Sequence, residues 1–188
     1  ENEFRQKIAS AHLRALIVDH DPSNRSTFSN YLKKLRVQVD EVCTGQDALN
    51  RLSEKGVQYY SFISIDLQLP GINGINTCMK IREMEKNMRF KNLIPIIVVT
   101  GNCTEQERIR CVDPIGEIQA ISFHQKPFTF KDCKLAIQMI FRKQKLKDAM
   151  GQKILIVDDD PFNTTVAEKF LKKNGFECDI CYNGQEAV

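Results

Sequence analysis

Short apolar runs alternate with longer runs of helical spacing along most of this chain, and this alternation constrains the fold more than any other feature. Several apolar runs have no polar face, which is typical of strands covered on both sides of a sheet. The pattern therefore predicts an α/β fold, a parallel sheet covered by helices, with right-handed crossovers. Strands are expected at residues 13–18, 37–42, 61–65, 93–99 and 120–124, and helices at 22–35, 45–54, 74–87, 104–112 and 130–149.

The chain also repeats itself at an offset of 139 residues. Leu16-Ile-Val-Asp-His-Asp-Pro-Ser-Asn24 returns as Leu155-Ile-Val-Asp-Asp-Asp-Pro-Phe-Asn163, and residues 16–49 share 14 of 34 positions with 155–188. A match that runs through a strand, a helix and the next strand predicts a duplicated domain with a truncated second copy. The expected organisation is a linker at 1–12, a first domain at 13–149 and the N-terminal part of a second at 150–188.

The second copy is shorter than the ~40 residues that usually fold alone. We expect it to pack on a surface supplied by the first domain, by a symmetry-related molecule or by a swapped partner. In the last two cases it would support self-association.

The charge and the cysteine content of the chain argue against several classes of protein. The net charge of +3 is too small to indicate nucleic-acid binding, and no apolar run could span a bilayer, so this fragment is expected to make no direct membrane contact. Seven scattered cysteines argue against a disulfide framework and indicate a reducing, cytoplasmic setting. Cys178 and Cys181 lack the second pair that a zinc site needs and are expected to be small buried residues on or beside a strand. A chain that begins at Glu1 with no signal peptide is expected to be a piece of a longer protein.

Polar residues gather where the predicted strands end. Asp19 follows the first strand, Asp66 follows the third, Thr100 ends the fourth and Lys126 follows the fifth. Ligand sites in open α/β sheets form at this edge. Clustered carboxylates are tolerated there when a lysine or a hard divalent cation such as Mg²⁺ neutralises them. A carboxylate beside such an ion can attack a phosphoryl group whose oxygens are neutralised.

In these motifs the chain resembles the receiver domains of response regulators in two-component phosphorelays. The resemblance rests on Val18-Asp19, on Asp66 followed by Leu69-Pro70 and Gly74, on the run from Pro95 to Thr100, and on Lys126-Pro127-Phe128. It covers residues 13–148, and 153–188 as the start of a second receiver. It implies a flavodoxin-like five-stranded sheet of order 2-1-3-4-5.

The resemblance also implies roles. Asp66 would be the phosphoacceptor, charged by a histidine kinase or a histidine phosphotransfer domain. Asp19, Asp66 and the Gln68 carbonyl would hold Mg²⁺. Lys126 would bind the phosphoryl group, and Thr100 with Phe123 would form the switch. Thr100 as a strand-end residue, Lys126 as a solvated charge and Phe123 as plain core remain alternatives.

Two departures from the family pattern stand out. The family has two adjacent acids after the first strand, and here the second is His20, whereas the second copy keeps Asp158-Asp159. Imidazole is a poor Mg²⁺ ligand, so His20 as a metal ligand should weaken cation affinity. Asp21 has a counterpart in Asp160 and is expected to point elsewhere. The span from Thr100 to Lys126 is also longer than in compact receivers.

Three functions are therefore weighed. The favoured one is a Mg²⁺-dependent phosphoacceptor domain for signal transduction rather than a classical enzyme. Tandem receivers resemble the C-terminal part of a hybrid histidine kinase, and the sequence leaves open whether that parent is membrane-anchored. A pseudo-receiver that only binds proteins is the alternative. The third is a phosphatase of the haloacid dehalogenase type, since Asp19-His20-Asp21, Thr100, Lys126 and Asp158-Asp159 imitate its order of motifs, although it gives Asp66 no role.

Overall fold

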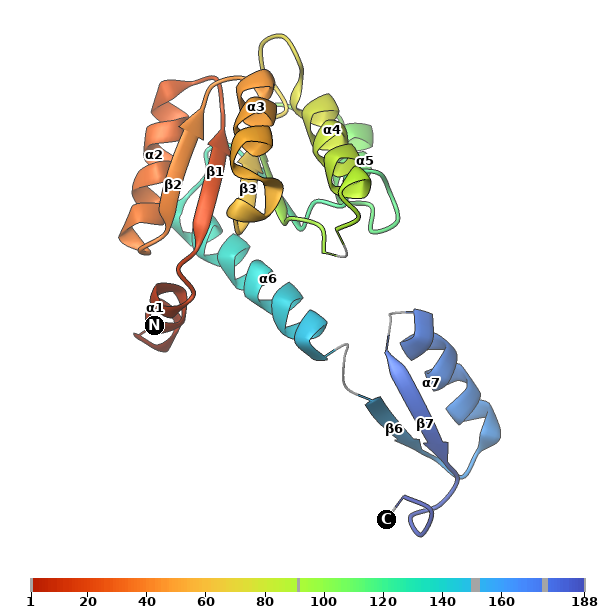
Figure 1. Ribbon diagram of the computed structural model, residues 1–188. Helices are drawn as coiled ribbons and strands as arrows, with labels where there is room; N and C mark the ends of the chain where they lie inside the picture. The colour runs from red at the N-terminus through yellow and green to blue at the C-terminus, as the bar shows by residue number, and fades with distance from the viewer. Residues whose placement is uncertain (1, 91, 150–152, 174–175, 188) are drawn as a thin grey trace. The chain divides into compact units, whose positions relative to one another are not determined.

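The computed structural model describes residues 2–90, 92–149, 153–173 and 176–187 (Figure 1). The chain divides into two compact units, Glu1–Ile140 and Phe141–Val188. This division falls inside one helix, α6 (Phe130–Ala149), rather than at residue 149. Each unit is described by itself below.

The first unit contains a five-stranded parallel sheet of order β2-β1-β3-β4-β5, which confirms the predicted flavodoxin-like topology. Its strands are β1 (Arg14–Val18), β2 (Gln38–Val42), β3 (Phe62–Ile65), β4 (Ile96–Thr100) and β5 (Ser122–Gln125). The fourth strand begins later than predicted, at Ile96, because Pro95 has no amide hydrogen to donate to the ladder. The Pro95 carbonyl still accepts from the Ile63 amide.

The helices of this unit fall close to their predicted positions, except for α1, where a linker was expected. They are α1 (Asn2–Ser10), α2 (Pro22–Lys34), α3 (Gly45–Lys55), α4 (Gly74–Asn87), α5 (Glu105–Val112) and α6, with a 3₁₀ turn at Val57–Tyr59. Side-chain caps begin five of them: Asp21, Thr44, Asn73, Thr104 and Thr129 accept from backbone amides of the first turn of α2, α3, α4, α5 and α6. Such caps satisfy amides that have no partner inside the helix.

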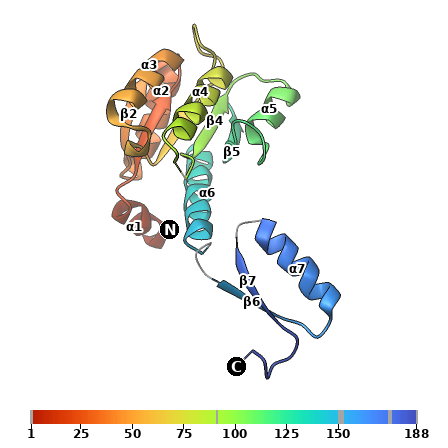
Figure 2. The ribbon, with the colours of Figure 1, turned by 45° about the vertical axis from the view of Figure 1, so that its right-hand side comes forward.

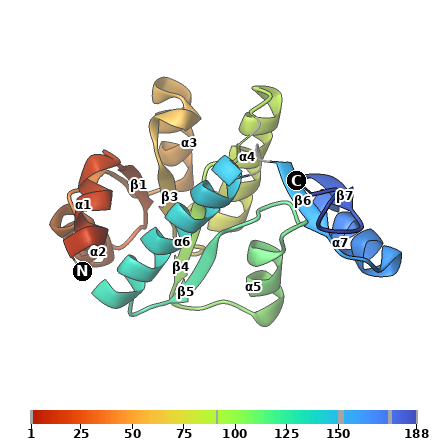
Figure 3. The ribbon, with the colours of Figure 1, turned by 90° about the horizontal axis from the view of Figure 1, so that it is seen from below.

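Helices cover both faces of the sheet. Buried residues of α3, α4 and α5 form one apolar cluster with side chains from one face of the strands, including Leu16 and Val18. Helices α2 and α6 pack on the opposite face (Figure 3), where Leu32, Ala136 and Ile137 are buried. Figure 2 brings β4 and β5 forward with α5 beside them. With both faces covered, the sheet edge at the strand carboxyl ends is left to carry polar residues.

Residues 1–12, expected to be a linker, contain helix α1 and belong to the first compact unit. Ile8 on this helix is completely buried. The segment is therefore part of the packed unit rather than a free tail. No helix among the described residues is long and apolar enough to cross a membrane.

The second unit contains β6 (Lys153–Val157), α7 (Pro161–Lys173) and β7 (Glu177–Cys181), with the two strands paired in parallel. Its register repeats that of the first unit, since Leu155 faces Asp179 as Leu16 faces Asp40. The seven cysteines are free thiols; Cys178 and Cys181 lie on β7 as expected, but they are only partly buried rather than buried.

Candidate functional site

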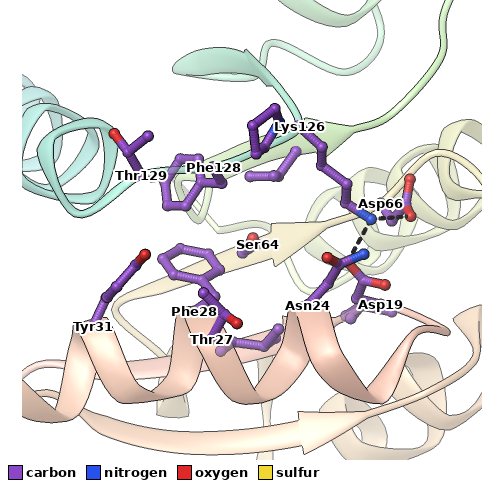
Figure 4. Close-up of a pocket in the computed structure, with 14 residues that line it drawn as sticks. Asp19, Asn24, Thr27, Phe28, Tyr31, Ser64, Asp66, Lys126, Phe128 and Thr129 are labelled. Atoms are coloured by element: carbon purple, nitrogen blue, oxygen red, sulfur yellow. Dashed lines mark hydrogen bonds and ion pairs between the residues drawn. The ribbon is translucent and has the colours of Figure 1, made fainter.

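Two buried carboxylates and one ammonium meet at the carboxyl edge of the sheet (Figure 4). Asp19 follows β1 and is 6% exposed, and Asp66 follows β3 and is 2% exposed. Lys126, which follows β5, places Nζ 2.6 Å from Asp66 Oδ2 and 2.7 Å from Asp19 Oδ2. Lys126 is thus a partner of both acids, and its alternative role as a merely solvated charge is wrong.

Backbone amides fix the orientation of both carboxylates. The Asp21 amide donates to Asp19 Oδ1 at 2.9 Å, and the Gln68 amide donates to Asp66 Oδ1 at 3.0 Å. Each acid therefore holds one oxygen on its own loop and turns the other toward Lys126. This arrangement follows from local sequence, since an aspartate commonly accepts from the amide two residues on.

The two acids also control Lys126. Burial alone would lower the pKa of its ammonium, but hydrogen bonds and charge from Asp19 and Asp66 outweigh burial and raise the pKa. The ammonium therefore stays charged and neutralises part of the acidic pocket. A positive charge at this point is suited to binding phosphoryl oxygens.

His20 lies at the rim of the same pocket with its side chain 49% exposed. Its Nδ1 atom is 3.7 Å from Asp66 Oδ2 and 4.0 Å from Asp19 Oδ1. Asp19, His20 and Asp66 each offer one ligand atom, and these atoms all lie within 4.8 Å of one another. The three residues can hold a cation together, while the Gln68 carbonyl as a fourth ligand stays a prediction.

Thr100 and Phe123, the predicted switch pair, lie on adjacent strands. Thr100 is completely buried, its hydroxyl donates to the Asn102 carbonyl at 3.2 Å, and its own carbonyl accepts from the Lys126 amide at 2.9 Å. Phe123 is half-buried and packs against the apolar cluster under α3, α4 and α5. The structure brings Thr100 to the edge that carries Lys126, and the switching of both residues stays a prediction.

Gly74 is required by the close approach of two backbone segments. A Cβ atom at this position would lie 2.1 Å from the Asp66 carbonyl oxygen and 2.6 Å from Leu67 Cα. The Gly74 amide donates to the Leu67 carbonyl at 2.9 Å. The start of α4 therefore rests directly on the loop that carries Asp66, which explains the spacing of the Pro-Gly-x-x-Gly segment.

Comparison with known proteins agrees with this geometry. The family model described as "Response regulator receiver domain" matches residues 15–138. The chain belongs to this family. The response regulator ArlR of Staphylococcus aureus is 27% identical over 168 residues, which cover 89% of this chain and 70% of ArlR.

Solved receivers share the fold. The receiver domain of the sensor histidine kinase PA1611 of Pseudomonas aeruginosa is 25% identical, with a TM-score of 0.56 over 69% of this chain and 98% of that one, and it was solved with magnesium coordinated in its active site cleft. The chemotaxis response regulator CheY4 of Vibrio cholerae is 21% identical, with a TM-score of 0.56 over 68% of this chain and 98% of that one.

Two neighbours of the receiver site were not identified from sequence. Arg25 donates to the Asp19 carbonyl at 2.6 Å and ties α2 to the end of β1. A cavity of about 280 Å³ lies beside Asp66 between α2 and the β5–α6 segment; its lining includes Asn24, Thr27, Phe28, Tyr31, Ser64, Phe128 and Thr129. Ser64, the one polar residue of the otherwise apolar β3, was the available clue.

Asp21 behaves as predicted and points away from the receiver pocket. Its Oδ1 atom accepts from the Ser23 amide at 2.7 Å and from the Asn24 amide at 3.4 Å as the cap of α2. Because this carboxylate is occupied at the helix, a dehalogenase-type site loses its second acid. The structure gives that alternative no support.

His124 lies on β5, beside the segment that carries Lys126. Nothing in the sequence indicated a buried imidazole here, but its Nε2 atom is buried with no hydrogen-bond partner in the described part of the chain. Burial lowers the pKa of this imidazole, although the charge of Asp132 acts in the opposite direction. Its ring packs edge to face on Phe128, with centroids 5.1 Å apart.

Proposed function

We propose that the first unit accepts a phosphoryl group on Asp66 from a phosphohistidine of a histidine kinase or a phosphotransfer domain. The observation that carries this proposal is the contact of one ammonium, Lys126, with two buried carboxylates, Asp66 and Asp19. Membership in the receiver family supports it, because receiver domains interact with such kinases and phosphotransfer proteins. The role is that of a phosphoacceptor in signal transduction rather than of a classical enzyme.

The chemistry follows from the positions of the groups. One oxygen of Asp66 attacks phosphorus, the bond from phosphorus to the donor imidazole nitrogen breaks, and that nitrogen leaves with the electron pair. Asp66 becomes an acyl phosphate, so its carboxyl group no longer carries the charge that paired with Lys126. The ammonium is then free to bind a phosphoryl oxygen, which compensates for the lost ion pair.

A divalent cation belongs in this proposal. The magnesium in the Pseudomonas aeruginosa receiver supports a cation at the equivalent pocket. Asp19 and Asp66 suit a hard cation, which would neutralise phosphoryl oxygens when bound. The third candidate donor, His20, does not match the oxygen ligands that Mg²⁺ prefers. The pocket therefore fits Mg²⁺ through its carboxylates and not through its complete donor set.

The deciding experiment is incubation with acetyl phosphate and Mg²⁺ followed by intact mass measurement. We expect a phosphate adduct that is lost in Asp66→Asn and retained in Asp21→Asn, the matched control whose carboxylate caps α2. An adduct that persists in Asp66→Asn would overturn the proposal. An adduct that forms only in His20→Asp would establish the pseudo-receiver alternative.

We also propose that residues 13–149 and 150–188 derive from tandem receivers in a hybrid histidine kinase. The shared register of β1–β2 and β6–β7 supports the duplication.

The open apolar surface of the second unit supports self-association, and the free thiols support a cytoplasmic location. Light scattering of the full chain tests self-association: a dimer that Phe170→Asp converts to monomer is expected, and a monomer at all concentrations would contradict it.

A further inference from the structure

The cation pocket of this receiver contains an imidazole among its donors, and the geometry allows it to coordinate. Two ligands that each lie about 2.1 Å from one metal ion are about 3.0 Å apart at a right angle and about 4.2 Å apart when opposite. His20 Nδ1 lies 3.7 Å from Asp66 Oδ2 and 4.0 Å from Asp19 Oδ1. Both separations fall inside that range, and the donor atoms of the three residues all lie within 4.8 Å of one another, so small side-chain movements let one ion contact all three.

Lys126 does not block these donors. Its Nζ atom contacts the Oδ2 atoms of both acids. The Asp19 atom nearest His20 is Oδ1, whereas the Asp66 atom nearest His20 is the Oδ2 that Lys126 also contacts. A carboxylate oxygen has two lone pairs and can accept a hydrogen bond and bind a metal together. The backbone amides that hold Asp19 and Asp66 keep the donor atoms in place before any ion arrives.

The donor types select the ion. Mg²⁺ prefers oxygen ligands in a strict octahedron, whereas an imidazole with carboxylates suits borderline transition metals. The second copy has Asp159 at the position of His20, so this imidazole distinguishes the first unit within the chain itself. We propose that the pocket of Asp19, His20 and Asp66 binds a borderline transition-metal ion such as Co²⁺ or Zn²⁺ through the His20 imidazole, and that this ligand raises its selectivity over Mg²⁺.

The inference builds on the proposed phosphoacceptor site, but its test needs no phosphoryl donor. Co²⁺ and Mg²⁺ are titrated separately into the full chain by calorimetry, and the visible absorption of bound Co²⁺ reports its ligands. The background is Cys178→Ser with Cys181→Ser, which removes the close thiol pair of β7. The compared variants are His20→Ala, which removes the imidazole and adds no charge, and His12→Ala, which removes an exposed imidazole elsewhere.

We expect His20→Ala to weaken Co²⁺ binding at least about tenfold and to change its spectrum, with Mg²⁺ affinity kept within about twofold. His12→Ala should change neither. Equal losses for both ions, or an unchanged Co²⁺ affinity, would overturn the inference. Metal binding and the phosphate adduct are measured separately. If the chain forms the phosphate adduct but His20→Ala does not selectively weaken Co²⁺ binding, the metal selectivity is refuted and the proposed phosphoacceptor function stands.

Discussion

Strands β1 and β6 contain the same run, Leu-Ile-Val, followed by aspartate, yet they differ in burial. In β1, which pairs with both β2 and β3, Leu16 and Val18 are 0% exposed. In β6, which pairs among the described residues with β7 alone, Leu155 and Val157 are each 46% exposed. The strand and its register are therefore set locally, whereas burial depends on strands and helices that come later in the chain.

The loops after these strands show the same division. The Asp160 amide donates to Asp158 Oδ1 at 2.9 Å, as the Asp21 amide donates to Asp19 Oδ1. Among the described residues, the only other partner of the Asp158 carboxylate is the side-chain nitrogen Nδ2 of Asn163, at 3.3 Å. The Asp19 carboxylate instead pairs with the Lys126 ammonium. The loop that presents the acid recurs in both units, and the positive charge that completes the site at Asp19 comes from Lys126, which follows β5.

The largest expected effect comes from truncating the repeated leucine in each copy. Leu16→Ala should lower the free energy of unfolding of the first unit by about 2–5 kcal/mol, because it removes a completely buried side chain and leaves a cavity. Leu155→Ala should cost about 1 kcal/mol or less, because half of that side chain already meets solvent. Hydrogen exchange of β1 and β6 in the full chain measures both. Equal losses would show that β6 is as deeply buried in solution as β1.

The next effect concerns a glycine shared by the two copies. A Cβ atom at Gly45 would lie 2.1 Å from Thr77 Oγ1 and 2.8 Å from the Ile72 carbonyl oxygen, so Gly45→Ala should cost about 1–3 kcal/mol in urea unfolding. At Gly184 no described atom lies within 4 Å of that position. Gly184→Ala should therefore be neutral within about 0.5 kcal/mol. A comparable loss at Gly184 would mean that another segment packs against it.

Sequence alone predicted the topology because alternating apolar runs and helix signals are local. It also gathered Asp19, Asp66 and Lys126, because strand ends of a parallel sheet meet at one edge. It did not find the Arg82–Glu85 pair of α4, in which Arg82 Nη1 lies 2.7 Å from Glu85 Oε2 and 2.9 Å from the Ile94 carbonyl. Charges three residues apart on a helix normally suggest a solvated pair, and their burial depends on the loop before β4.

The details of the site were also harder to predict, because they depend on contacts between residues that are distant in the sequence. The sequence identified His20 as a departure from the family pattern but gave no distance from its ring to Asp66. The sequence predicted that Asp21 points away from the site, because Asp160 occupies the matching position of the repeat, but it did not predict that Asp21 caps α2. The contact of the His124 ring with Phe128 was not predicted, because it depends on how the chain turns after β5.

A smaller effect should be the same in both copies. Asp21 caps α2 and Asp160 accepts from the Phe162 amide at 2.8 Å at the start of α7. Asp21→Ala and Asp160→Ala should each destabilise their own helix by about 1 kcal/mol, because a cap acts within one turn. Hydrogen exchange of the α2 and α7 amides should therefore accelerate by similar factors. A response in α2 alone would show that α7 already exchanges through opening of the whole second unit.

The smallest effect is a pH dependence that the second unit should lack, since residues 141–188 contain no histidine. Burial holds the pKa of His124 below the ordinary 6.5, with Asp132 opposing. Below that pH the unfolded chain binds a proton that the folded imidazole resists, so the free energy of unfolding should fall as pH drops. His124→Leu should reduce this fall in urea midpoints between about pH 7 and 5, measured against His12→Gln. If His124→Leu keeps the pH slope of the native sequence, the His124 imidazole is not the cause of the slope. Carboxylates, which both units contain, would then have to cause it.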